Sequence, residues 1–219
     1  MSLALMLIII EIEGDLLIQE GDILMQEDRN AVVNLWSDVS IPYVISGDLE
    51  DREANILAAF KMISENTCLR FHRRTTELNY IKFLNGKGCA SYVGCRGGAQ
   101  PVYYSHSCSI GNLCHEIIHA LGMHHEHTRT DRDEHITVQW QSIKTGKEKN
   151  FMMKEGDTLN LPYDLSSIMH YGKYFFTADL SPTILPKKDG VQIGQRKHLS
   201  KLDIEKIKRL YHCDERANL

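Results

Sequence analysis

The chain has 219 residues, of which 42% are hydrophobic, and this composition suits one or at most two compact domains with a real core rather than a disordered chain. Its formal net charge is -4 and it has no long basic run, so nucleic acid is excluded as an expected partner. The longest apolar stretch, residues 3–10, is too short to cross a membrane, so no membrane association is expected.

The first 29 residues differ in composition from the rest. Residues 1–10 have the length of a signal-peptide apolar core, but they lack a basic flank and a small-residue cleavage site. Residues 11–29 are acidic and contain the near-repeat EGDLLIQ and EGDILMQ. We therefore expect residues 1–29 to be a leader and appendage, and residues 30–219 to form the globular part.

The globular part has the periodicities of an α+β protein. Runs rich in β-branched and aromatic residues predict strands, in chain order, at residues 41–45, 68–71, 79–83 and 101–104. The spacing of apolar residues predicts helices at residues 49–66, 112–121 and 201–211. Glycines indicate turns over residues 85–98, and the chain after residue 143 is mostly polar and irregular until the last helix.

The second predicted helix carries the residues that point to chemistry. His115 and His119 are four residues apart, so on a helix they lie on one face and can bind one metal ion. Glu116 lies beside the first ligand, where a base that takes a proton from metal-activated water is needed. Gly122 is expected to end the helix, because glycine tolerates a positive φ, and to let His125 complete the ligand set. Three protein ligands and one open position are typical of a catalytic zinc site.

A helix with two solvated or hydrogen-bonded histidines is the alternative interpretation of a short HExxH match. The longer pattern H-E-x-x-H-x-x-G-x-x-H is far more restrictive, and it favours the metal site. His124 and His127 are also near in sequence, but the spacing from Gly122 selects His125 as the third ligand. We expect the other two histidines around the site or on the surface.

Six cysteines are scattered along the chain, at Cys68, Cys89, Cys95, Cys108, Cys114 and Cys213. Their spacing is not that of a structural zinc site, and their even number favours disulfides over the alternative of buried free thiols. If they pair, an oxidising, extracellular compartment follows, so we expect a secreted protein.

The sequence resembles the astacin family of zinc endopeptidases, which belongs to the metzincin group. The family's pattern H-E-x-x-H-x-x-G-x-x-H-E-H-x-R-x-D-R-D is matched by HEIIHALGMHHEHTRTDRD at residues 115–133, and its Met-turn with the following tyrosine by SIMHY at residues 167–171. LWSDVSIPY and TCLRF also resemble astacin sequences, so the likeness covers residues 30–213. Within the family, the chain is similar to the fish hatching enzymes.

This resemblance implies a zincin-like fold of two lobes that binds one Zn²⁺ per subunit. The N-terminal lobe, about residues 30–122, is expected to hold a twisted mixed sheet and the active-site helix. The C-terminal lobe, about residues 123–219, is expected to be irregular and to end in a helix. The implied activity is hydrolysis of peptide bonds in proteins by zinc-activated water, with Glu116 as general base.

The resemblance also implies roles for single residues. His115, His119 and His125 would bind the zinc, with Tyr171 as a further, weaker ligand that moves away when substrate arrives and then donates a hydrogen bond to the oxyanion. Met169 would form the apolar floor under the metal, which is hardly different from an ordinary core methionine.

Residues 1–29 become a leader and propeptide by the same resemblance. Family propeptides place an aspartate of an F-x-G-D pattern on the zinc, and Asp22 is the candidate here, although Gln19 stands in place of the phenylalanine. Asp15 is the competing aspartate, and a solvated acidic tail is the alternative for the whole segment. Cleavage after Arg29 would free a new amino terminus, which the family buries near the residue that corresponds to Glu126, a structural rather than catalytic role.

Family pairing, carried over to this chain, joins Cys68 to Cys213 and Cys89 to Cys108. The remaining cysteines, Cys95 and Cys114, have no counterpart in the basic family pattern, and we expect them to pair with each other.

The leading interpretation is a secreted zinc endopeptidase made as a zymogen, which acts as a monomer on polypeptides and, like hatching enzymes, on egg-envelope protein. One alternative is a catalytically silent binding protein on the same fold, and another is a zinc hydrolase acting on small amides. An intact Glu116 beside three histidines argues against the silent protein.

Overall fold

The computed structural model describes residues 18–19, 21–24 and 35–216. The expected leader at residues 1–10, the competing Asp15 and the processing site at Arg29 lie outside these residues. Among the described helices, none has both the length and the apolar content that crossing a membrane requires.

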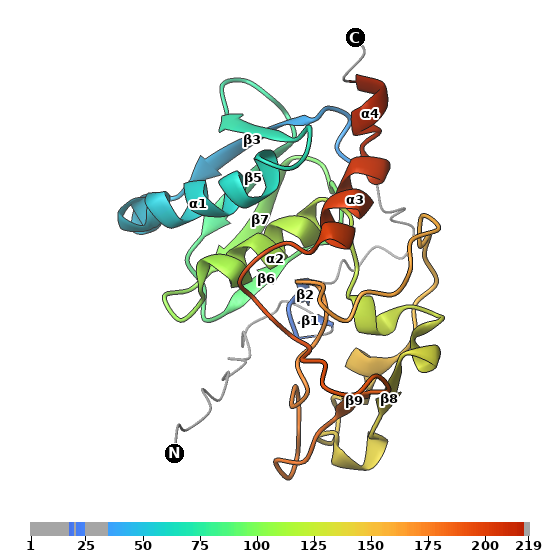
Figure 1. Ribbon diagram of the computed structural model, residues 1–219. Helices are drawn as coiled ribbons and strands as arrows, with labels where there is room; N and C mark the ends of the chain where they lie inside the picture. The colour runs from blue at the N-terminus through green and yellow to red at the C-terminus, as the bar shows by residue number, and fades with distance from the viewer. Residues whose placement is uncertain (1–17, 20, 25–34, 217–219) are drawn as a thin grey trace.

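A seven-stranded mixed sheet forms the frame of the larger part of the molecule (Figure 1). Its spatial order is β1-β2-β6-β7-β5-β3-β4. The strands are β1 Ile18–Gln19, β2 Ile23–Leu24, β3 Ser40–Ile45, β4 Arg70–Arg73, β5 Tyr80–Leu84, β6 Cys89–Ser91 and β7 Ala99–Tyr104. Strands β4, β3, β5 and β7 are parallel to their neighbours in that group, whereas β6 is antiparallel to β7. Tyr43 of β3 lies opposite Arg73 and Ile81 in this register.

Two helices, α1 and α2, pack against each other and against the sheet (Figure 1). A 3₁₀ turn, η1 Gly47–Arg52, precedes α1 Glu53–Ser64, so the single helix predicted at residues 49–66 is divided. The active-site helix is α2 Ile110–Ala120. Two further helices, α3 Lys201–Leu210 and α4 Cys213–Arg216, end the described chain.

Sequence periodicity missed the short strands, which depend on backbone pairing with distant partners more than on their own side chains. Strand β6 lies within the glycine-rich stretch predicted as turns, and β4 begins two residues after the predicted start. Strands β8 Ile136–Val138 and β9 Ile184–Pro186 form a separate antiparallel pair in the later part of the chain. Short 3₁₀ turns fill much of the rest, at η2 Glu126–Thr128, η3 Arg132–Glu134, η4 Trp140–Ser142 and η5 Glu148–Phe151.

The main hydrophobic core lies between the sheet and the two helices. It includes Ile56 and Phe60 of α1, Ile117 of α2, and Phe83 of β5, all of which are buried. Burial of each such side chain stabilises the fold by about 1.5–3 kcal/mol. A second, smaller apolar cluster forms around Phe151 in the later part of the chain. The main core also takes in Met169 and Ile207, so residues from beyond position 123 help to support α2.

Both ends of α2 are fixed by local hydrogen bonds. Ser109 and Asn112 form a reciprocal capping box at its start. At its end, the Gly122 N–H donates to the His119 carbonyl and the Met123 N–H donates to that of Ile118, the paired bonds of a Schellman motif. Gly122 has a φ of 106°, as its predicted role as a helix stop requires.

Two disulfides join distant segments: Cys68 to Cys213 and Cys89 to Cys108, the pairs that the family resemblance implied. The expected pairing of Cys95 with Cys114 is wrong, because both are free, buried thiols. The Gly94 N–H donates to the His119 carbonyl, which places Cys95 at the far end of α2. Cys114 lies five residues before His119, about 7.5 Å along the helix axis, which is beyond ordinary disulfide reach.

Candidate metal centre

Three imidazoles converge at the end of α2. His115 and His119 come from the helix, and His125 comes from the segment that turns back after Gly122. The Nε2 atom of His125 lies 3.2 Å from the Nε2 atoms of both other histidines. All three rings are buried and face one point, so the histidines that the sequence selected do lie together.

Backbone carbonyls orient two of the rings. His115 Nδ1 donates to the Ile168 carbonyl at 2.9 Å, and His119 Nδ1 donates to the Met123 carbonyl at 2.7 Å. Because Nδ1 carries the hydrogen, Nε2 presents its lone pair to the shared point. Burial, aided by the charge of Arg196, lowers the pKa of His115 to about 4, and this keeps the ring in the neutral form that binds metals.

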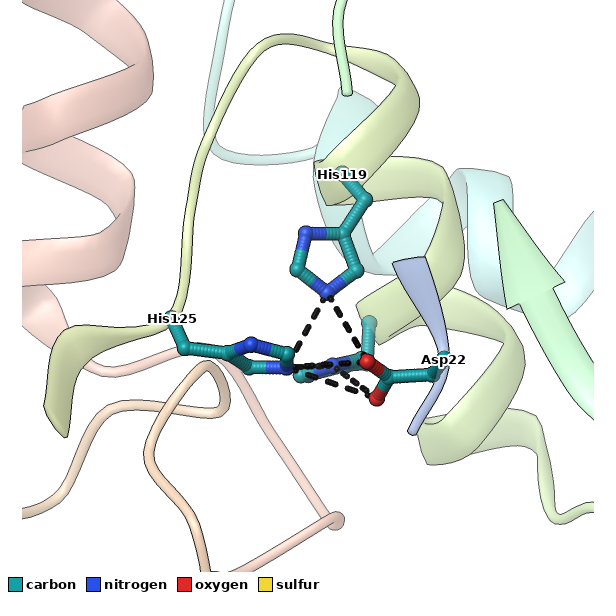
Figure 2. A group of neighbouring side chains, drawn as sticks. Asp22, His119 and His125 are labelled. Carbon is teal, nitrogen blue, oxygen red and sulfur yellow. Dashed lines mark hydrogen bonds and ion pairs between the residues drawn. The ribbon is translucent and has the colours of Figure 1, made fainter. Parts of the chain in front are cut away.

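Asp22 supplies a fourth ligand group at the same point. Its Oδ2 lies 3.2 Å from His115 Nε2, and its Oδ1 lies 3.2 Å from His125 Nε2 and 3.9 Å from His119 Nε2. Figure 2 shows the carboxylate facing the rings of His119 and His125. Burial opposes ionisation of Asp22, but its close contacts with His125 and His115 hold its pKa well below the usual value.

These four groups fit a tetrahedral zinc ion. Zinc binds imidazole nitrogen at about 2.0–2.1 Å, so two ligands of one ion lie about 3.3 Å apart, close to the separations seen here. Lone pairs that face each other at this distance repel unless a cation lies between them. Asp22 Oδ1, which points to this place, is buried and has no hydrogen-bond partner among the described residues. The zinc cofactor that the sequence indicated is therefore compatible with this donor set.

Glu116 lies next to the ligand set but outside it. Its side chain is buried, and its Oε2 has no hydrogen-bond partner within the described part of the chain. Burial raises the pKa of Glu116 well above the usual value, and the nearby negative charge of Asp22 raises it further. A carboxyl group with an unused oxygen beside a metal site suits a proton acceptor.

The segment Ser167 to Tyr171 lies against the ligands, as the Met-turn likeness implied. Met169 is buried, and its carbonyl accepts a hydrogen bond from the Glu126 N–H at 3.1 Å. The ring of Tyr171 lies with its centroid 4.7 Å from that of His125 and stacks on His127 at 3.7 Å. His127 is thus a buried neighbour of the site rather than a surface residue.

Glu126 is buried beside the third histidine and has several partners. Its Oε2 accepts from Lys206 Nζ at 2.7 Å, and its Oε1 accepts from Arg129 Nη1 at 3.0 Å and from the Asp164 N–H at 2.9 Å. The expected pairing of Glu126 with an amino terminus freed by cleavage after Arg29 involves residues that lie outside the described part of the chain.

Sequence reasoning missed Asp203, which holds the Met-turn from the first turn of α3. Its Oδ1 accepts from the Ser167 hydroxyl at 2.6 Å and its Oδ2 from the Ile168 N–H at 2.9 Å, so it fixes the residue whose carbonyl orients His115. The capping pattern at Ser200 could have signalled a helix start, but only the tertiary structure brings that start to the site.

A hairpin brings Asp22 to the site from far away in the sequence. Strand β2 adds to the edge of β6, where the Ser91 N–H donates to the Asp22 carbonyl at 2.9 Å. At the turn, Gly21 has a φ of 79°, and a Cβ there would lie 2.4 Å from the ring of Phe176. The Gly21–Asp22 turn therefore packs closely against Phe176, and a side chain at Gly21 would overlap with that ring.

The chain is similar to known protein sequences. The model of the astacin peptidase family matches residues 28–212. High choriolytic enzyme 1 of Oryzias latipes is 38% identical over 91% of this chain and 79% of its own length. Zinc metalloproteinase nas-15 of Caenorhabditis elegans is 39% identical over 84% of this chain, which spans only 34% of that protein.

Solved structures show the same likeness. The hatching enzyme zinc-protease High choriolytic enzyme 1 of Oryzias latipes superposes with a TM-score of 0.77 and 39% identity, covering 82% of this chain and 93% of that one. Myroilysin shares the fold at a TM-score of 0.58, with 19% identity over 81% of this chain and 95% of the other. The predicted α+β fold is confirmed.

Proposed function

Since the chain belongs to the astacin family and is a zinc metalloendopeptidase, we propose that His115, His119 and His125 bind its zinc and that Glu116 is its general base. One observation carries the proposal: three buried Nε2 atoms face one point, and an unpartnered Glu116 oxygen lies beside it within the described part of the chain. Tyr171, packed on His125, is proposed as the further ligand and hydrogen-bond donor.

Bound zinc supplies a Lewis acid that polarises both a water molecule and the scissile carbonyl. Glu116 takes a proton from that water at Oε2 and passes it to the leaving amine nitrogen, so no covalent enzyme intermediate is needed. The buried surroundings keep bulk water from competing for the carboxylate. Tyr171 turns its hydroxyl to the oxygen on which negative charge develops.

Asp22 makes the uncleaved chain a zymogen in this proposal. Its carboxylate takes the place that water needs, and the β1–β2 hairpin covers the edge strand β6. Removal of residues 1–29 by cleavage after Arg29 would free both. The division into a propeptide, an N-terminal lobe to about residue 122 and a C-terminal lobe belongs to the same proposal.

The two disulfides support secretion into an oxidising compartment. The substrates are polypeptides, and the likeness to a hatching enzyme zinc-protease supports egg-envelope protein as a candidate substrate. We propose that the chain acts as a monomer.

A quenched-peptide assay with and without chelator, on protein processed at Arg29, tests this function. We expect chelator-sensitive cleavage, and we expect Glu116→Gln to retain zinc while losing about 10²–10⁴-fold in kcat, because it removes the base and leaves the ligands. Metal content is measured on both proteins by atomic absorption.

Cleavage by the Glu116→Gln variant at the parent's rate would contradict the mechanism. A processed parent that binds zinc but cleaves neither peptides nor proteins would instead favour the silent binding protein. Turnover of small amides alone would favour the other zinc hydrolase.

A further inference from the structure

Glu126 directly follows the third zinc ligand, and it is a buried carboxylate whose charge is already balanced. Its side chain is 1% exposed. The ammonium group of Lys206 lies 2.7 Å from Oε2, and the guanidinium group of Arg129 lies 3.0 Å from Oε1. A buried carboxylate needs such partners, since leaving it unpaired is strongly destabilising.

The two cations that pair with Glu126, Arg129 and Lys206, differ in their number of partners. Arg129 also donates to both carboxylate oxygens of Asp131, at 2.9 and 2.7 Å, so its charge is shared. Among the described residues, Glu126 is the one hydrogen-bond and ion-pair partner of the Lys206 ammonium group. Asp164, which adjoins this group, takes its hydrogen bonds from Ser166 and Ser200. Arg129 is thus shared between Glu126 and Asp131, and Lys206 is, within the described part of the chain, the cation that serves Glu126 alone.

Lys206 is held firmly in place. It lies in α3, which begins with a reciprocal capping box at Ser200 and is followed by the disulfide of Cys213. Its neighbour Ile207 is fully buried in the main core. From this position Lys206 pairs with Glu126, the residue directly after His125. The backbone N–H of Glu126 in turn donates a hydrogen bond to the Met169 carbonyl.

We propose that Lys206 is the resident counter-ion of Glu126 and, through it, a positioning residue for His125. The inference rests on the proposed zinc site. It differs from the family expectation, in which the amino terminus freed at Arg29 supplies that cation. In this proposal, His125 is already held in position in the uncleaved chain, before any new amino terminus is freed.

The rate of zinc release to a chromogenic chelator tests the proposal on both the full chain and the processed chain. We expect Lys206→Met to speed release about 10-fold or more in both, as changes behind a ligand commonly do. Lys206→Arg keeps the charge and should stay within about twofold of the parent. Lys201→Met, at the exposed start of the same helix, is the matched control and should change nothing. If Lys206→Met does not fold, Lys206→Gln replaces it with the same expectation.

A double-mutant cycle separates the charge pair from a simple packing role. In a Glu126→Gln background, we expect Lys206→Met to add less than about twofold, because its partner is gone. Acetylating the amino terminus of the processed chain should leave zinc release at the parent's rate.

Three outcomes would overturn the proposal: release at the parent's rate in Lys206→Met, an equal effect of that change in both backgrounds, or an effect of acetylation as large as that of Lys206→Met. Zinc release is measured without turnover, so failure of the peptidase assay leaves this test intact. A parent protein that binds no zinc would end the proposed function itself.

Discussion

Gly122 decides whether the third histidine, His125, can reach the other two. It ends α2 in a conformation that side chains rarely adopt, with a φ of 106°. A Cβ at this position would also lie 2.7 Å from Leu35 Cδ2. Glycine is therefore favoured by the backbone conformation, whereas Leu35, whose side chain is exposed, can move aside.

We expect Gly122→Ala to destabilise the fold by about 1–2 kcal/mol, the cost of a side chain in the left-handed region. For a chain of this size that corresponds to a fall in Tm of about 2–8 °C. Calorimetry on the zinc-bound protein measures it, with Gly156→Ala as control, since Gly156 has open space and no positive φ. An unchanged Tm in Gly122→Ala would show that the turn is not strained by a side chain.

Cys95 and Cys114 make a second prediction at this scale. Burial raises the pKa of the Cys114 thiol, and both side chains are enclosed in the core. Because the thiolate is the reactive form, neither residue should react with iodoacetamide in the native state. Mass spectrometry should find both thiols alkylated after unfolding without reduction, and neither before. Native labelling of either residue would mean that this part of the core opens.

At the scale of elements, the β1–β2 hairpin is the part that brings a carboxylate to the three histidines. It extends the sheet at β6 by backbone pairing and carries Asp22 onto the ligand nitrogens. Three described elements therefore meet at one place: the hairpin, α2 and the segment that contains His125.

We expect Asp22→Ala to make the uncleaved chain more active, because a charge-assisted contact to the three histidines is lost. Its rate of cleavage of a short quenched peptide should rise about 10-fold over that of the uncleaved parent. The remaining hairpin still covers β6, so the gain stays below that of full processing. The control is Asp189→Ala, an exposed carboxylate elsewhere on the chain. If both variants keep the parent's latency, Asp22 is not the group that blocks the site.

At the scale of the whole molecule, the Cys68–Cys213 disulfide joins the segment just before β4 to the first residue of α4. It closes a loop with a sequence separation of 145 residues, against 19 for Cys89–Cys108. The longer loop restricts the unfolded chain more. It also holds α3, which supports both the Met-turn through Asp203 and Glu126 through Lys206.

Removing the first bridge by Cys68→Ala with Cys213→Ala should cost about 5 kcal/mol on the loop-closure relation, and removing the second by Cys89→Ala with Cys108→Ala about 3 kcal/mol. Chemical denaturation of the two double variants, followed by fluorescence, gives the comparison. A larger loss for the shorter loop would mean that local contacts, rather than chain entropy, dominate.

The sequence by itself determined which histidines lie together, because their convergence depends on local spacing. A separation of four residues places His115 and His119 on one helix face, and Gly122 stops that helix shortly before His125. The main helices and central strands were also predictable, since their apolar periodicity extends over enough residues to be recognised. The correct cysteine pairs came from family likeness rather than from spacing, and the expectation that joined Cys95 to Cys114 was wrong.

Only the tertiary structure decided what surrounds those histidines. Asp22 lies 103 residues from His125, Lys206 lies 80 residues from Glu126, and Asp203 lies 35 residues from Ile168. No local periodicity encodes such contacts, because they form when a strand edge is filled or when a helix end docks on a buried turn. Burial then makes each of these polar contacts necessary, since a charged group taken out of water must find its partner within the fold.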